Sequence, residues 1–253
     1  MNKIKLNVLT KEFNKDIGKD TTNKVIKISL GGLQEVHLKN IQLMSDDDHG
    51  NLASQSLCMT EMFLYELEKK FQTKDCEAIV LICGSFKDYK LISTLKDEPD
   101  ILFLKNTYEL EVPFRYSEFE NATNKKKILA DTLEKAILYL CELKNWDSQL
   151  VKATFKKMKE KEYKAEIKGR TKLSPDKKRK AYPLIELDLK QFTLYLVVED
   201  NKRNILDKKL IAKTDTYLEE ISYHMRELKW LTDHEVALFK RAHKTVYTSI
   251  RLS

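Results

Sequence analysis

The chain has 253 residues, enough for one large domain or two small ones, and its 42% hydrophobic content is spread in periodic runs that exclude a disordered chain. No stretch approaches the roughly 20 consecutive apolar residues of a membrane-spanning helix, so we expect no membrane insertion. The net charge of +7 is concentrated, because residues 151–182 hold thirteen basic and four acidic side chains, a local charge of +9. Such a positive segment indicates an anionic partner, which is nucleic acid, an anionic membrane or an acidic protein surface.

The N-terminal region predicts strands. Residues 4–8 alternate as a strand does, and residues 25–30 and 33–43 are apolar runs that flank Gly31 and Gly32. Two glycines between such runs supply the positive φ angles of a tight turn, so they predict a β-hairpin. The first residues include no continuous apolar region and no small-residue cleavage site, so we expect no signal peptide and a cytoplasmic protein.

Helical spacing then alternates with apolar runs. Residues 51–72 predict a helix, with an apolar face of Leu57, Leu64, Leu67 and Phe71, widened by Met59, Met62 and Phe63. Residues 78–83 form a continuous apolar run that ends at Gly84, which is typical of a strand buried on both faces. Residues 101–104 and 108–114 predict two more strands.

The middle of the chain predicts two helices, one at residues 124–144 and one from Asp147 to about Glu160. Thr123 or Asn124 is suited to cap the first helix, and Asp147 the second. Because only Asn145 and Trp146 join them, we expect a bent helical pair.

The last third returns to strands. We expect a strand at 163–171 and a polar loop at 173–180. A meander follows, with strands at 184–189, 192–198 and 205–211 and one turn at 201–204. Residues 215–229 predict a helix. After Trp230 two interpretations remain. Residues 232–235 resemble a helical capping box, whereas 236–239 and 246–250 favour a pair of strands, which is the interpretation we prefer.

These elements together predict an α+β fold in which antiparallel sheets pack against helices. The chain forms either one continuous domain or two lobes, residues 1–122 and 123–253.

The cysteines indicate free thiols. Cys58, Cys76, Cys83 and Cys141 show no CxxC spacing, and three of them fall at apolar positions of predicted helices or strands. Buried thiols in a reducing compartment fit this placement better than disulfides do.

No motif predicts a metal site, a cofactor or an active site. Residues 46–49 are Asp-Asp-Asp-His, but four consecutive side chains seldom converge on one ion without intervening turn glycines, so we interpret them as a solvated loop before a helix. His224, His234 and His243 lie ten and nine residues apart, which is not the spacing of a helical metal pair. The GxSxG, P-loop, GxGxxG and HExxH patterns are absent, so we expect a non-catalytic protein.

The basic segment has two parts. Lys152 to Lys161 form the outer face of an amphipathic helix, which any surface helix shows. The better binding candidates follow it, where residues 177–180 are expected at the tip of a loop; the candidates are Lys168, Arg170, Lys172, Lys177, Lys178, Arg179 and Lys180. A solvated loop without a partner is the alternative. Lysine outnumbers arginine 39 to 7, and this argues against bidentate reading of phosphates and guanines.

The pattern of residues 124–250 resembles that of bacterial immunity proteins of polymorphic toxin systems. It consists of a Lys-rich entry to an apolar helix at 125–129, the run Lys144-Asn145-Trp146-Asp147, a basic strand–loop–strand, the strand 192–198, and Trp230-Leu231-Thr232-Asp233 before the last apolar run. The resemblance implies a cytoplasmic, non-enzymatic protein that neutralises a cognate toxin. Because most such inhibitors are acidic, the charge of +7 argues against a basic nuclease as the target. The alternative function is nucleic-acid binding by residues 168–180.

Overall fold

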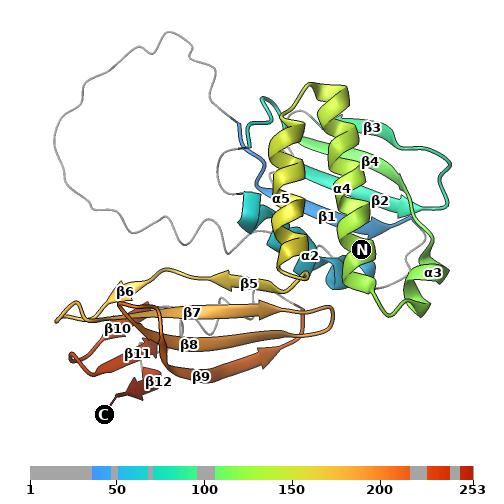
Figure 1. The fold of residues 1–253 in the computed structure, drawn as a ribbon. Coiled ribbons are helices and arrows are strands. Elements are labelled where there is room, and N and C mark those ends of the chain that lie inside the picture. The colour runs from blue at the N-terminus through green and yellow to red at the C-terminus, as the bar shows by residue number, and fades with distance from the viewer. Residues whose placement is uncertain are drawn as a thin grey trace, which may run out of the picture.

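The computed structural model describes residues 36–46, 51–67, 71–95, 106–216, 227–239 and 246–252. Its elements form three sheets and a layer of helices (Figure 1). This mixture, with strands and helices packed together, confirms the predicted α+β class. The strands expected at 4–8, 25–30 and 101–104 lie outside the described residues.

The first sheet has the order β1-β2-β4-β3; its strands are β1 (Asn40–Ser45), β2 (Ala78–Gly84), β3 (Lys90–Leu95) and β4 (Thr107–Pro113). This sheet is mixed, not antiparallel, because β1 pairs in parallel with β2 and β2 with β4. Helix α2 (Leu52–Leu67) provides the crossover that parallel pairing of β1 and β2 requires. Strand β3, which the sequence pattern did not predict, pairs antiparallel with β4 at the edge.

Three further helices follow: α3 (Tyr116–Asn121), α4 (Lys125–Lys144) and α5 (Ser148–Glu160). The predicted pair α4 and α5 is confirmed, and the Asp147 side chain caps α5 by accepting hydrogen bonds from the backbone of Gln149 and Leu150. Asn124 occupies the cap position of α4 but makes no side-chain cap bond. Helix α4 ends where Asn145 adopts a left-handed conformation, which turns the chain toward α5.

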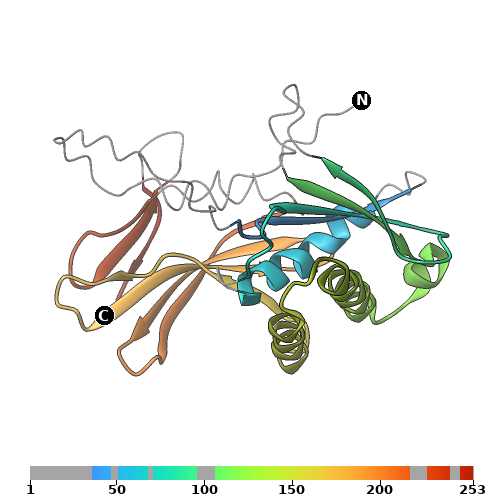
Figure 2. The same cartoon turned by 90° about the horizontal axis from the view of Figure 1, so that it is seen from above.

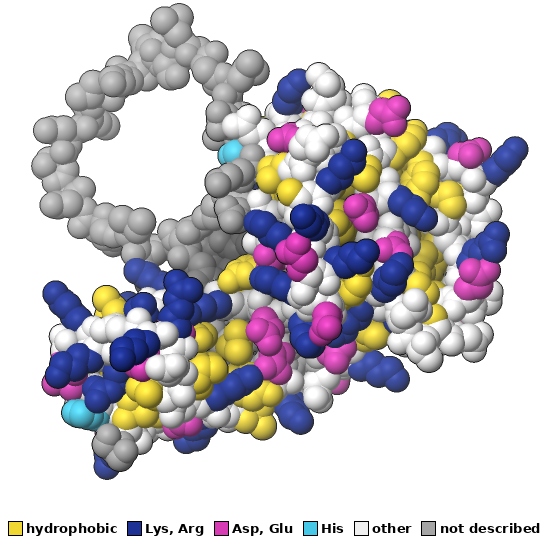
Figure 3. All heavy atoms as spheres, viewed as in Figure 1, with side chains coloured by type: hydrophobic (Ala, Val, Ile, Leu, Met, Phe, Trp, Pro, Cys, Tyr) yellow, Lys and Arg dark blue, Asp and Glu magenta, His cyan; other side chains and the backbone are white. Residues whose placement is uncertain are grey.

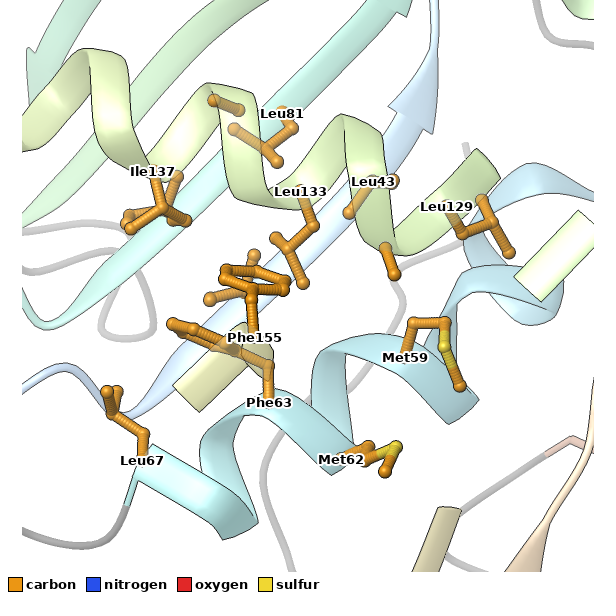
Figure 4. Close-up of a cluster of buried hydrophobic side chains, with 14 of the residues drawn as sticks. Leu43, Met59, Met62, Phe63, Leu67, Leu81, Leu129, Leu133, Ile137 and Phe155 are labelled. Carbon is orange, nitrogen blue, oxygen red and sulfur yellow. The ribbon is translucent and has the colours of Figure 1, made fainter. Parts of the chain in front are cut away.

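Helices α2, α4 and α5 cover one face of the first sheet, and the main core lies between them (Figure 2). Figure 4 shows this core, in which the rings of Phe63 and Phe155 stack with centroids 4.8 Å apart. On β2, Ile79 and Leu81 are fully buried beneath the helices, whereas Val80 and Ile82 on the opposite face are only half-buried. The strand is central, as predicted, but within the described residues it is fully buried on one face only.

The second sheet contains the predicted meander; its strands are β5 (Ala165–Lys168), β6 (Lys172–Leu173), β7 (Arg179–Leu187), β8 (Phe192–Asp200) and β9 (Ile205–Thr214). All of its pairings are antiparallel, in the order β5-β7-β8-β9 with β6 also beside β7. Ile185, Leu187, Phe192 and Leu194 point from its inner face into the main core.

The third sheet comprises β10 (Glu227–Trp230), β11 (Glu235–Phe239) and β12 (Val246–Arg251), all antiparallel. The preferred strand interpretation of the C-terminus is therefore confirmed. The predicted helix at 215–229 is wrong at its end, where pairing with β11 overrides helical spacing; residues 217–226 lie outside the described residues. Val236, Leu238 and Ile250 pack against Leu196 and Val198 of the second sheet.

The main core joins residues on both sides of Ala122, since α4 and α5 cover the sheet that earlier residues build. All four cysteines are buried in the structure with free thiols. Within the ranges described, no helix has the length and hydrophobicity needed to cross a membrane.

Candidate binding surface

The outer face of the second sheet combines exposed aliphatic side chains with paired lysines and glutamates. Because paired residues share a face, the register places Leu173, Lys180, Glu199 and Ile205 in one row across β6, β7, β8 and β9. A second row holds Lys168, Leu184, Tyr195 and Leu210. The intervening residues, among them Ala181, Leu196 and Val198, point inward to the third sheet. Figure 3 views the outer face, where hydrophobic side chains lie over β7, β8 and β9 between basic and acidic ones.

Lys168 covers one tyrosine of this face. Its ammonium group lies 3.5 Å from the centre of the Tyr182 ring and 3.3 Å from a carboxylate oxygen of Glu199. The Tyr182 hydroxyl donates a 3.0 Å hydrogen bond to the other carboxylate oxygen of Glu199. Burial raises the pKa of Tyr182 to about 12, and the hydrogen bond to Glu199 and the negative charge of that carboxylate add to the effect. Lys168 is thus largely compensated within the fold.

A matching arrangement surrounds the second tyrosine. The Lys208 ammonium group lies 4.0 Å from the centre of the Tyr195 ring and 2.6 Å from a carboxylate oxygen of Glu186. Both lysines combine a cation–π contact with an ion pair. At the centre of the outer face the two tyrosine rings consequently lie beneath lysine side chains, and the lysines there are balanced by glutamates.

An open groove of about 500 Å³ borders this face. It is lined by the ends of α2 and α5 and by outer-face residues of β5, β7 and β9; its charged lining residues are Glu160, Lys161, Glu162, Lys164, Glu166 and Lys168. Lys161 forms a 2.5 Å ion pair with Glu66, which ties the end of α5 to α2. The equal number of acids and lysines gives the groove no net preference for an anion.

Large aliphatic side chains are exposed around the outer face. The exposed fractions are 53% for Leu173, 59% for Ile205 and 49% for Leu210, and Leu206 beside them reaches 46%. Isolated apolar residues on a surface are common. Here Leu173 lies at one end of its row and Ile205 at the other, with Lys180 and Glu199 between them.

Of the predicted binding residues, Lys177 and Lys178 lie at the exposed tip of the β6–β7 hairpin. The β8–β9 turn lies beside them, because the Asn201 side chain donates a 3.2 Å hydrogen bond to the Lys177 carbonyl. This turn adds Lys202 and Arg203, which the sequence pattern did not single out. We call these four residues the basic tip; Figure 3 shows basic side chains gathered at this end of the sheet.

The predicted loop at 173–180 is shorter than expected, since β6 includes Leu173 and β7 begins at Arg179. Arg179 is largely buried, lies 3.3 Å from a carboxylate oxygen of Asp176 and donates a 3.0 Å hydrogen bond to the Asp233 carbonyl. Lys180 is half-buried within β7. These two residues therefore belong to the sheet and not to a protruding loop.

Arg170 and Lys172 are exposed on the segment between β5 and the hairpin. The Lys172 carbonyl accepts a 3.1 Å hydrogen bond from the Trp230 indole, so its backbone anchors β10 while its side chain remains available. The structure thus brings Lys177 and Lys178 together with new basic residues, and it engages the side chains of Lys168 and Arg179 in contacts within the fold. Lys180 lies half-buried in the outer-face row of β7.

Across the described residues, no three His, Cys, Asp or Glu side chains gather as metal ligands do. Asp46 is the described member of the acidic run 46–49, and its carboxylate packs so closely on Gly84 that a Cβ at that glycine would collide with it. The chain matches no protein-family model, no curated protein and no solved structure.

Proposed function

We propose that the protein is a non-catalytic binding module that captures a protein partner on the outer face of its second sheet. The exposure of Leu173, Ile205 and Leu210 around Tyr182 and Tyr195 is the observation that carries this proposal. Exposed aliphatic side chains among polar and charged ones are typical of protein interfaces. The basic tip at one end would attract an acidic partner and orient it.

Three acidic residues argue against nucleic acid on this same face. Glu166, Glu186 and Glu199 lie among its lysines, and a phosphate backbone would be repelled by their carboxylates. The tyrosine rings are also covered by Lys168 and Lys208, which leaves them poorly placed to stack on bases.

A cognate bacterial toxin is the partner that we propose, and the protein then acts in the cytoplasm as its immunity protein. The resemblance of residues 124–250 to immunity proteins supports this choice. The outer face lies within that segment, and its basic tip suits a toxin with an acidic surface.

The proposal is tested by capture from the native cell with the tagged chain, with and without nuclease treatment. We expect a protein to be retained after nuclease treatment and to be lost with the double variant Leu173→Glu/Ile205→Glu. Leu143→Glu is the matched control, because Leu143 is 50% exposed on α4, away from this face. If the double variant retains the partner as well as the wild-type chain does, the proposal is contradicted.

Nucleic-acid binding remains a second candidate because Lys177, Lys178, Lys202 and Arg203 converge at the basic tip. If it holds, nuclease treatment removes the captured material. Neutralising the tip would then lower the log–log salt slope of binding to duplex DNA by about 0.9 for each lost phosphate contact.

A further inference from the structure

We infer that the basic tip attaches the protein peripherally to an anionic lipid surface, with its cations among the headgroups and neighbouring aliphatic side chains just beneath them. This inference goes beyond the proposed function, because a lipid surface is a second ligand beside the protein partner.

The basic tip carries positive charge that the fold does not neutralise. Its two turns lie at the end of the second sheet that extends past the helices (Figure 1). Residues 174–180 and 200–204 hold six basic and two acidic side chains. Among the described residues, the side chains of Lys177, Lys178, Lys202 and Arg203 form no ion pair, and all four are exposed. An anionic surface therefore meets four unpaired cations at this end.

The two aspartates of these turns are held by hydrogen bonds within their own turns. Asp176 accepts a 2.6 Å bond from the Ser174 hydroxyl and a 3.1 Å bond from the Lys178 backbone amide. Asp200 accepts 2.8 Å bonds from the backbone and side-chain amides of Asn204. These bonds lower the pKa of both carboxyl groups. The aspartates thus shape the turns and hold the cations in place beside each other.

Large aliphatic side chains flank the same two turns. Leu173, 53% exposed, ends β6 just before the first turn. Ile205 and Leu206, 59% and 46% exposed, begin β9 just after the second turn. Four neighbouring strands span only about 15 Å, so these side chains and the cations of the basic tip occupy one small area.

The combination of lysines and aliphatic side chains favours a lipid surface over nucleic acid. Three of the four cations are lysines, whose point charge suits mobile headgroups, whereas the arginine fork is favoured where phosphates are fixed. A duplex backbone offers no apolar layer that would cover Ile205 and Leu206. A bilayer offers both, because cations bind its headgroups while aliphatic side chains enter the acyl boundary below.

The test measures flotation of the full chain with lipid vesicles. Vesicles of phosphatidylcholine and phosphatidylglycerol, at roughly three to one, should bind the chain, and vesicles of phosphatidylcholine alone should not. Each cation near an anionic surface strengthens binding roughly fivefold. We therefore expect at least about thirtyfold weaker binding for the variant Lys177→Gln/Lys178→Gln/Lys202→Gln/Arg203→Gln.

A matched control separates the basic tip from net charge. The same number of exposed cations is removed from the outer face of α5 by Lys152→Gln/Lys156→Gln/Lys157→Gln/Lys159→Gln. This variant should bind the anionic vesicles within about threefold of the wild type, because its basic tip is intact. Thermal melting verifies that both variants remain folded, as exposed substitutions allow.

A single apolar substitution tests whether the aliphatic side chains enter the lipid. Leu206→Gln keeps every charge of the basic tip and should weaken vesicle binding at least about threefold. Leu143→Gln, at a position of α4 that is 50% exposed, should leave binding unchanged.

The inference is overturned if the wild type does not float with anionic vesicles at about 0.05 M salt. It is also overturned if the two fourfold variants weaken binding equally, or if Leu206→Gln binds as the wild type does. Displacement from the vesicles by duplex DNA or polyglutamate at an equal concentration of charges would likewise overturn it. The vesicle assay contains no protein partner, so its outcome is independent of the proposed capture of a protein.

Discussion

The guanidinium group of Arg179 donates a 3.0 Å hydrogen bond to the carbonyl oxygen of Asp233, and this bond ties the start of β7 to the turn before β11. Arg179 also lies 3.3 Å from a carboxylate oxygen of Asp176 within its own hairpin. The side chain thus links two sheets at the end that carries the basic tip. Four consecutive basic residues in the sequence consequently have two different roles.

Arg179→Ala should therefore destabilise the fold. It removes a largely buried charged donor and leaves the Asp176 carboxylate without its ion pair, so we expect a loss of about 1–3 kcal/mol in the free energy of unfolding. Lys177→Ala/Lys178→Ala, at exposed positions of the same hairpin, should change it by less than about 0.5 kcal/mol. Urea denaturation of the two variants compares them directly. Equal effects would show that Arg179 is as dispensable as its neighbours.

A charge placed on β2 should destabilise the protein to different extents on the two faces of the first sheet. Leu81 is fully buried under the helices, so Leu81→Asp is expected to cost several kcal/mol and to prevent stable folding. Val80 lies half-buried on the opposite face, and Val80→Asp should cost less. Soluble yield and thermal melting measure both. A more damaging Val80→Asp would place the main core on the other side of the sheet.

The stability of the protein should fall as the pH rises toward neutrality because of Glu61. This half-buried side chain of α2 loses hydration on folding, and burial raises its pKa from 4.5 to about 7. The folded state then binds a proton that the unfolded state releases between pH 4.5 and 7, so this group lowers the free energy of unfolding across that window.

Glu61→Gln should remove this dependence and raise stability above pH 7 by up to about 3 kcal/mol. Parallel denaturant titrations between pH 5 and pH 8 make the comparison, with Glu142→Gln, at an exposed position of α4, as the control. If the stability of the wild type and of Glu61→Gln changes equally between pH 5 and pH 8, the raised pKa of Glu61 is ruled out.

The cysteine thiols should be inert in the folded protein. Burial raises the pKa of Cys58, Cys76, Cys83 and Cys141 to about 12, so little reactive thiolate forms at neutral pH. A thiol reagent should find four free thiols under denaturing, non-reducing conditions and react only slowly with the native chain. Rapid native labelling, or two thiols after denaturation, would be inconsistent with four buried free cysteines.

Local signals predicted the elements that depend on local physics. Asp147 caps α5 as its position indicated, and the meander follows from alternation between polar turns. Elements that depend on distant partners were missed. The residues of β3 show no distinct strand pattern, and this strand forms by pairing with β4. The residues of β10 have helical spacing but pair with β11.

The same distinction holds for the binding surface. The charge excess at residues 177 and 178 is visible in the sequence, and both residues are exposed. Lys202 and Arg203 join the basic tip only because the strands align in register. The row from Leu173 to Ile205 likewise forms only through the pairing of β6, β7, β8 and β9. The compensation of Lys168 by Glu199 likewise joins residues 31 positions apart.

The central claim is that the outer face of the second sheet binds a protein, and its most direct test is a calorimetric titration of the captured, purified partner into this protein. We predict that Leu173→Glu/Ile205→Glu weakens the affinity at least tenfold, while Leu143→Glu leaves it within twofold and both variants melt near the wild-type temperature. Equal affinity of the double variant and the wild type would contradict the account.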